Sequence, residues 1–143
     1  DNAFGGPLIV MGRSLGSASA LELAANYGEE LEGLIIESGF ALALPLLKLL
    51  GVQAWALDLT EDDGFGNLEK IRAYHGPTLI IHAEYDHIIP LSEGEALWDA
   101  CPSSDKTLLE IPGANHNDIF MHGIREYFDA IKNLADKVKK RSA

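Results

Sequence analysis

The sequence predicts an α/β fold, with a mostly parallel four-stranded sheet and flanking helices. Two observations support this prediction. Short apolar segments alternate with longer segments of helical periodicity, so that strand and helix follow one another four times. The 143 residues are 47% hydrophobic and contain no internal repeat, low-complexity segment or obvious linker. Such an alternation is typical of a parallel sheet, and the length fits a single domain over residues 1–143.

The individual elements follow from the same patterns. We expect strands at residues 8–11, 31–37, 77–83 and 106–111, and helices at residues 14–27, 41–50, 68–73, 92–100 and 117–140. Pro45 is expected to begin or bend the second helix, and the acidic, glycine-containing segment 53–67 to be irregular. Ser92 and Glu95 predict a capping box. In the last helix, an apolar face is expected to be core: Phe120, Ile124, Tyr127, Phe128, Ile131, Leu134 and Val138.

The composition argues against several classes of partner. A net charge of −11 disfavours nucleic acids and charge-driven binding to anionic lipid. The longest apolar run, residues 41–50, is interrupted by Pro45 and Lys48 and is too short for a transmembrane segment. The first residues lack the basic patch and the long apolar core of a signal peptide. The single cysteine, Cys101, excludes an internal disulfide and fits a reducing compartment, so a cytoplasmic location is expected.

The segment Gly12-Arg13-Ser14-Leu15-Gly16 matches the pattern G-x-S-x-G at the point where a strand becomes a helix. A serine on such a sharp turn has strained backbone geometry, and its hydroxyl projects above the carboxyl edge of the sheet. Small residues are expected at Gly12 and Gly16 because larger side chains would collide with the neighbouring strand and helix. The alternative is a glycine-rich turn in which Ser14 only caps the helix. A nucleotide loop is less well supported, since the sequence has neither G-x-G-x-x-G nor G-K-[ST].

A serine nucleophile needs a base, and the base needs an acid that orients it. Asp86 follows the third predicted strand, and His116 lies between the fourth predicted strand and the last helix. In a parallel sheet these positions, like Ser14, fall at the carboxyl ends of strands, where sites in open α/β folds form. The chain order Ser, Asp, His is also that of α/β-hydrolases. The sequence therefore predicts a Ser-His-Asp triad.

These motifs resemble the α/β-hydrolase superfamily, over strands five to eight of its fold. The similarity is greatest to serine hydrolases related to the alpha/beta hydrolase domain-containing type 17 depalmitoylases, the alpha/beta hydrolase domain-containing type 13 proteins and their bacterial relatives. Such proteins carry a G-x-S-x-G elbow, a P-x-L-x-I-H-G-x-x-D-x-x-I segment and a G-x-x-H-N-D-I segment. Residues 12–16, 77–89 and 113–119 are the counterparts here, with Ala83 where the family often has glycine.

The resemblance implies a role for each matching residue. Ser14 would be the nucleophile, His116 the general base, Asp86 the acid, and the N–H of Leu15 one oxyanion donor. The implied reaction is hydrolysis of a carboxylic ester or thioester through an acyl-enzyme, on a small-molecule ester or acyl substrate and without a cofactor. A non-catalytic α/β-hydrolase-like binding domain and a serine peptidase on the same fold are the alternatives.

The family also has strands before the elbow and a loop that supplies a second oxyanion N–H. Because those N-terminal strands are absent from the 143 residues, the first predicted strand should be an exposed edge. We therefore expect the chain alone to be weakly active or inactive, and to self-associate through that edge.

Other polar residues have simpler interpretations. Glu37 also ends a strand and could act as a substitute acid, although a polar residue at a strand end is the favoured interpretation. His82 lies in an apolar strand and is expected to be a core histidine. His87 is expected to be exposed, and Cys101 to be structural.

No metal site is expected. His122 follows His116 by six residues, which does not place both on one face of a helix. Residues 58–69 only partly match a calcium loop, because Thr60 and Asp63 stand where an acid or amide and a glycine belong.

An apolar set near the second helix has two interpretations, as an acyl pocket or as ordinary core: Leu46, Leu47, Leu49, Leu50, Val52 and Trp55. A core role is favoured for each of these residues taken singly.

Overall fold

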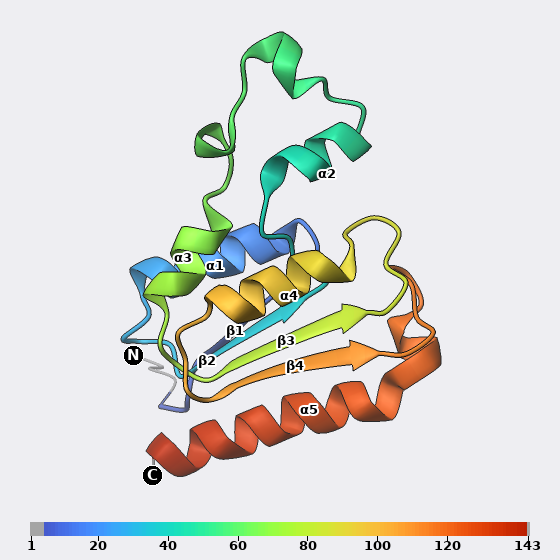
Figure 1. Cartoon of the computed structure of the whole chain (residues 1–143). Helices are drawn as coiled ribbons and strands as arrows, with labels where there is room; N and C mark the ends of the chain where they lie inside the picture. The colour runs from blue at the N-terminus through green and yellow to red at the C-terminus, as the bar shows by residue number, and fades with distance from the viewer. Residues whose placement is uncertain (1–4, 143) are drawn as a thin grey trace.

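The computed structural model describes residues 5–142, and within them forms a four-stranded sheet in the order β1-β2-β3-β4. The strands are β1 (Ile9–Arg13), β2 (Gly33–Glu37), β3 (Thr78–Ala83) and β4 (Lys106–Ile111). Each neighbouring pair is parallel, so all the carboxyl ends lie at one edge of the sheet (Figure 1). The predicted fold class is confirmed.

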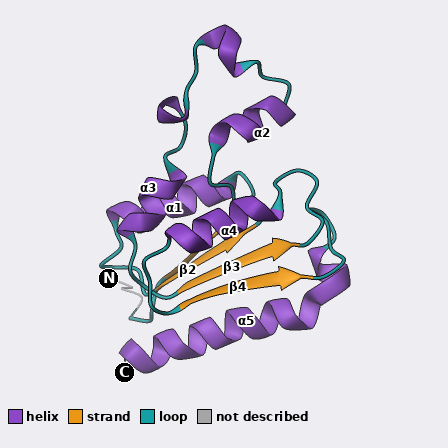
Figure 2. Ribbon diagram, viewed as in Figure 1, coloured by secondary structure: helices purple, strands orange, loops and turns teal. Residues whose placement is uncertain are grey.

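Helices cover both faces of the sheet (Figure 2). The helices are α1 (Gly16–Asn26), α2 (Ala43–Leu49), α3 (Asn67–Ala73), α4 (Leu91–Ala100) and α5 (Ile119–Ser142). Leu34 and Ile36 of β2 pack into one apolar cluster with residues of α1, α3 and α4, whereas Ile35 packs with α5. Since successive strand side chains point to opposite faces, a strand covered on both sides must be apolar throughout.

The segment between β2 and α3 extends away from the sheet, and contains α2 (Figure 1). Two one-turn 3-10 helices, Ala54–Leu57 and Glu61–Asp63, lie where the sequence predicted irregular chain. The Glu61 carboxylate accepts hydrogen bonds from the N–H groups of Ala43 (2.8 Å) and Leu44 (2.7 Å). It thereby satisfies free donors at the start of α2, and Pro45 falls in the first turn, where proline is tolerated.

The capping box predicted at Ser92 is wrong. Helix α4 begins at Leu91 after Pro90, and no side chain caps it. The carboxylate of Glu93 instead binds the N–H groups of Ala41 (2.8 Å) and Leu42 (2.9 Å), on the segment that follows β2. A tertiary contact has therefore replaced the local one.

The apolar face of α5 is only partly core. Tyr127, Leu134 and Val138 are buried, but Phe120 and Phe128 are about half exposed, as is Ile124. The helix is kinked at Gly123 (φ −149°, ψ 40°), where a Cβ would come within 2.7 Å of Ile111. Exposed positions occur on both sides of the kink, so the predicted continuous core face does not form. No helix within residues 5–142 combines the length and apolar character needed to cross a membrane.

Strand β1 lies at an edge of the sheet. Among residues 5–142 it pairs only with β2. Met11 of this strand and Leu8 just before it are about half exposed. An unpaired edge of this kind can pair with another chain, and self-association of the chain through β1 stays a prediction.

Candidate active site

Three side chains far apart in sequence meet at the carboxyl edge of the sheet. Ser14 follows β1, Asp86 follows β3 and His116 follows β4. The loops after β3 and β4 lie side by side at this edge (Figure 1). His116 Nε2 is 3.1 Å from Ser14 Oγ, and His116 Nδ1 is 2.7 Å from Asp86 Oδ2. The structure thus brings together the three residues singled out as a triad, and both Asp86 and His116 are buried.

Ser14 sits on a strained turn. Its φ of 52° lies in the left-handed region, which non-glycine residues rarely adopt. The Ser14 N–H donates to the carbonyl oxygen of Glu37 at 2.9 Å, and the Ser14 carbonyl accepts from the N–H of Ser17 at 3.0 Å. Hydrogen bonds on both sides of the residue hold it in this conformation, as expected for a serine that must project from the sheet.

The two glycines of the motif are not equivalent. A Cβ on Gly12 would lie 2.4 Å from the carbonyl oxygen of Gly16 and 2.7 Å from the Cβ of Ala20. A Cβ on Gly16 would meet no atom within 4 Å in the described part of the chain. The expected need for a small residue holds at Gly12, but it is wrong at Gly16, where a side chain would enter open space.

Leu15 is the residue directly before α1, and its N–H is at the amino end of that helix. Within residues 5–142 it donates to no backbone or side-chain acceptor, unlike the N–H of Ser14. The first N–H groups of a helix lack internal partners and lie at the positive end of the helix dipole. Leu15, the residue after Ser14, therefore offers a free donor of the kind that can stabilise an oxyanion.

The carboxylate of Asp86 has a fixed orientation. Its Oδ1 accepts from the N–H groups of Ile88 (2.9 Å) and Ile89 (2.8 Å), while Oδ2 faces His116 Nδ1. A buried carboxylate needs such partners. Because Asp86 can only accept, His116 Nδ1 carries the proton, and the lone pair of Nε2 faces the Ser14 hydroxyl.

A second histidine lies next to this carboxylate. His82 is fully buried in β3; its Nε2 is 2.8 Å from the carbonyl oxygen of Ile89 and 3.7 Å from Asp86 Oδ2. Burial lowers the pKa of His82 below its ordinary value of 6.5. The neutral ring donates from Nε2–H to Ile89, and its Nδ1 has no hydrogen-bond partner among residues 5–142. His82 is thus a core histidine, as expected, and it supports the Asp86 loop.

The lowered pKa of His82 predicts how stability depends on pH. In the unfolded chain His82 takes up a proton near pH 6.5, whereas in the folded chain it stays neutral to lower pH. The contribution of His82 to the free energy of unfolding is therefore fully present above pH 6.5. It decreases as the pH falls below 6.5, by at most about 1.4 kcal/mol per pH unit. Urea unfolding at several pH values should show a shallower decline for His82→Gln than for the wild type.

The matched control is His87→Gln, since His87 is exposed on the loop that follows β3. The free energy of unfolding of His87→Gln should fall with decreasing pH as steeply as that of the wild type. If His82→Gln and the wild type lost stability equally between pH 7 and pH 5, His82 would not be held neutral by burial.

Glu37 does not approach the His116 ring. Its carboxylate accepts from Arg13 Nε at 2.9 Å and from the Tyr127 hydroxyl at 2.7 Å. The substitute-acid interpretation therefore has no geometric support. No role was predicted for Arg13 or Tyr127, because in the sequence Arg13 is a variable position of the motif and Tyr127 belongs to the apolar face of the last helix. One signal could have indicated the contact between Arg13 and Glu37: Glu37 is an acidic residue at the end of an apolar strand, and Arg13 is a basic residue at the end of the neighbouring strand.

The remaining polar candidates do not join the site. His122 pairs with Asp118 at 3.5 Å on the surface of α5. Cys101 is buried beside the Thr78 hydroxyl. No group of three or more histidine, cysteine or acidic side chains within residues 5–142 is arranged to hold a metal ion.

An apolar cavity of about 170 Å³ adjoins the Asp86 loop. Leu46 and Leu49 of α2 line it together with Phe40, and Ile88 and Ile89 line its other wall. Ile89 and Phe40 also pack against Ala18, one turn after Ser14 on α1, so the cavity floor touches the nucleophile helix.

Four members of the apolar set fit neither interpretation given from sequence: Leu47 and Val52 are half-buried and lie outside the cavity beside Asp86, and Leu50 and Trp55 are exposed. Leu50 is 65% exposed and Trp55 is 78% exposed, so neither is core, and neither lines the cavity beside Asp86. Val52 and Trp55 line a separate hollow further along the extended segment.

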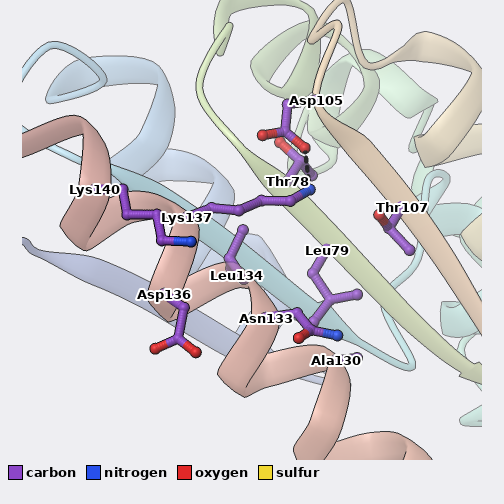
Figure 3. Close-up of a pocket in the computed structure, with 10 residues that line it drawn as sticks. All are labelled: Thr78, Leu79, Asp105, Thr107, Ala130, Asn133, Leu134, Asp136, Lys137 and Lys140. Carbon is purple, nitrogen blue, oxygen red and sulfur yellow. Dashed lines mark hydrogen bonds and ion pairs between the residues drawn. The ribbon is translucent and has the colours of Figure 1, made fainter.

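A second cavity, of about 400 Å³, lies at the opposite edge of the sheet, between β3, β4 and α5 (Figure 3). Lys137 reaches Asp105 there at 2.8 Å, and Arg141 contacts the same carboxylate at 3.1 Å. Because this cavity sits at the amino ends of the strands, it is separate from the edge where Ser14 and His116 meet.

No family model matches the chain. Its sequence is similar to the human alpha/beta hydrolase domain-containing protein 17B, with 31% identity over 134 residues, 91% of this chain and 42% of that protein. It is 29% identical over 129 residues to the alpha/beta hydrolase domain-containing protein aho-3 of Caenorhabditis elegans, covering 90% of this chain and 36% of that one. The chain therefore spans about two fifths of the length of these curated relatives.

The fold is also similar to solved structures. The esterase domain of a Rhodothermus marinus protein matches with a TM-score of 0.67 and 18% identity, over 90% of this chain and 60% of that one. With the curated relatives, this similarity confirms the expected resemblance: the chain has the α/β-hydrolase fold.

Proposed function

We propose that this chain, which has the α/β-hydrolase fold, carries the active site of a serine hydrolase acting on carboxylic esters or thioesters. One observation carries the proposal: the continuous hydrogen-bonded series from Ser14 Oγ through the His116 ring to the buried Asp86 carboxylate. Similarity to alpha/beta hydrolase domain-containing proteins supports hydrolysis as the reaction class.

The first half of the proposed reaction forms an acyl-enzyme. Ser14 Oγ attacks the carbonyl carbon of the ester while His116 Nε2 takes the hydroxyl proton. The carbonyl oxygen becomes an oxyanion, which the free N–H of Leu15 stabilises. The carbonyl then re-forms, and the bond from its carbon to the leaving oxygen or sulfur breaks. The imidazolium of His116, which Asp86 stabilises, gives its proton to that leaving atom, so an alcohol or thiol departs.

The second half releases the acyl group. A water molecule replaces the alcohol or thiol beside His116 and loses a proton to Nε2 as its oxygen attacks the acyl carbon. The bond from that carbon to Ser14 Oγ breaks, and Ser14 recovers a proton from His116. The carboxylic acid leaves, and the enzyme is restored without a cofactor.

The cavity beside Asp86 is the proposed place for the apolar part of a small-molecule substrate. Its walls are mostly apolar side chains, including Phe40, Leu46 and Ile88, and it adjoins both the nucleophile helix and the acid loop. Apolar walls next to a few oriented polar groups are typical of small-ligand sites.

The oxyanion site affects the choice of the first test. Leu15 is the one backbone donor identified for the oxyanion within residues 5–142, whereas the fold normally uses two. Loss of one oxyanion donor lowers kcat by about 10²–10³-fold in a characterised protease. A covalent probe is therefore a better first test than turnover, because it needs only an activated serine.

A fluorophosphonate probe tests the assignment of Ser14. The wild-type chain should be labelled at Ser14, and Ser14→Ala should abolish labelling. Ser17→Ala is the matched control, since Ser17 lies three residues away, is buried, and has a hydroxyl without a hydrogen-bond partner among residues 5–142. This variant should be labelled like the wild type. Equal labelling of the wild type and Ser14→Ala, with peptide mapping to another residue, would refute the proposal.

A further inference from the structure

We propose that Arg13, Glu37 and Tyr127 form a clamp that positions His116 against Ser14. The inference rests on the proposed function, since it concerns the same serine and histidine. None of the three side chains contacts the His116 ring, so they act as positioning residues that join the two loops.

Glu37 is the centre of this clamp. It is 2% exposed at the end of β2, directly opposite Arg13 in the strand register. Its side chain accepts from Arg13 Nε (2.9 Å) and from the Tyr127 hydroxyl (2.7 Å), and its carbonyl oxygen accepts from the N–H of Ser14 (2.9 Å). One residue therefore holds the backbone of the nucleophile turn and organises the two side chains around it.

Arg13 connects this centre to the histidine loop. While its Nε donates to Glu37, a terminal nitrogen donates to the carbonyl oxygen of His116 at 2.5 Å. The guanidinium is planar and rigid, so fixing one nitrogen fixes the direction of the others. The backbone of His116 is thereby tied to the residue that precedes Ser14, although the two lie 103 positions apart.

Tyr127 connects the clamp to α5, the helix that follows the His116 loop. Burial raises the pKa of the Tyr127 hydroxyl well above its ordinary value of 10.0, and the neighbouring Glu37 raises it further. The hydroxyl therefore remains protonated and donates to Glu37 over the working pH range. This bond sets where α5 lies relative to β2, and the loop carrying His116 enters that helix.

The clamp matters because the contact it controls is sensitive to distance. His116 Nε2 and Ser14 Oγ are 3.1 Å apart, and both groups are on loops rather than inside regular elements. A displacement of about 1 Å in a reacting pair can cost about 10²-fold in rate. Loosening the clamp should therefore lower the rate of the chemical step and leave the affinity for the probe or substrate nearly unchanged.

The test measures fluorophosphonate labelling at Ser14 as a function of probe concentration. Arg13→Met keeps the side-chain stem but removes every donor, and it should lower the limiting labelling rate by about 10- to 100-fold. The half-saturating probe concentration should change little. Arg13→Lys, which can reach Glu37 or the His116 carbonyl but not both, should recover part of the rate. Glu37→Gln combined with Arg13→Met should cost little more than either alone.

Tyr74→Phe is the matched control for Tyr127→Phe. The Tyr74 hydroxyl is also buried and donates to a carbonyl, that of Leu31, at 3.1 Å, on the other face of the sheet. Both variants lose one buried hydrogen bond, but only Tyr127→Phe should slow labelling. Rates are compared per folded molecule, with the folded fraction taken from circular dichroism.

The outcomes separate the clamp from the proposed function. If the wild type is not labelled at Ser14, the proposed function fails and the clamp with it. If the wild type is labelled but Arg13→Met and Tyr127→Phe react as fast as Tyr74→Phe, the clamp is wrong while the proposed function stands. A lower limiting rate in the clamp variants, partly restored by Arg13→Lys, supports the clamp.

Discussion

Asp86→Asn is expected to lower kcat by about 10⁴-fold while leaving the fold intact. The reason lies in the two oxygens of the carboxylate. Asp86 Oδ1 accepts from the N–H groups of Ile88 and Ile89, so an asparagine must place its carbonyl oxygen there. Its NH₂ group then faces His116 Nδ1, which has to accept instead of donate. The proton of the ring moves to Nε2 and points at Ser14, and such a ring cannot take the hydroxyl proton.

Turnover of an activated ester and labelling by a fluorophosphonate probe both measure this effect. Asp99→Asn is the matched control, because it makes the same change at an exposed position of α4. Its activity should equal that of the wild type. An Asp86→Asn chain within tenfold of the wild-type rate would show that His116 does not depend on this carboxylate for its tautomer.

The position of the site could be predicted because it depends on topology. Short apolar segments predict strands, and a parallel sheet places the carboxyl ends of all strands at one edge. Ser14, Asp86 and His116 each follow a strand, so the sheet itself brings them together. No side-chain detail was needed for that step.

The clamp could not be predicted in the same way. Arg13 and Glu37 are 24 positions apart, and Glu37 and Tyr127 are 90 apart, so neither contact leaves a local pattern. Tyr127 fits the helical spacing of a core face whether or not its hydroxyl donates a hydrogen bond, so the spacing does not predict the bond to Glu37. The hydrogen bond that gives it a role exists only once α5 packs beneath β2.

The local rules failed where a tertiary contact was available. Ser92 and Glu95 have the spacing of a capping box, yet α4 starts one residue earlier, after Pro90. Glu93 in its first turn binds backbone donors beyond β2. Gly16 shows a different limit: its spacing from Ser14 fits the motif, but only the packing reveals that its environment is open.

The second large effect is expected from Gly12→Ala. A methyl group on Gly12 would lie 2.4 Å from the carbonyl oxygen of Gly16 and 2.7 Å from the Cβ of Ala20. Neither atom is the end of a flexible side chain, so β1 and α1 must move apart. Overpacking of this kind costs about 3 kcal/mol in free energy of unfolding. The movement also displaces Ser14, so labelling per folded molecule should fall with stability.

Gly16→Ala provides the comparison, because it adds the same methyl group four residues away in open space. Alanine is the better helix former, so urea unfolding should show unchanged stability or a gain of up to about 1 kcal/mol. Labelling at Ser14 should remain at the wild-type rate. Equal losses in the two variants would mean that the motif requires glycine for backbone freedom at both positions. A loss confined to Gly12→Ala would locate the requirement in the contact between β1 and α1.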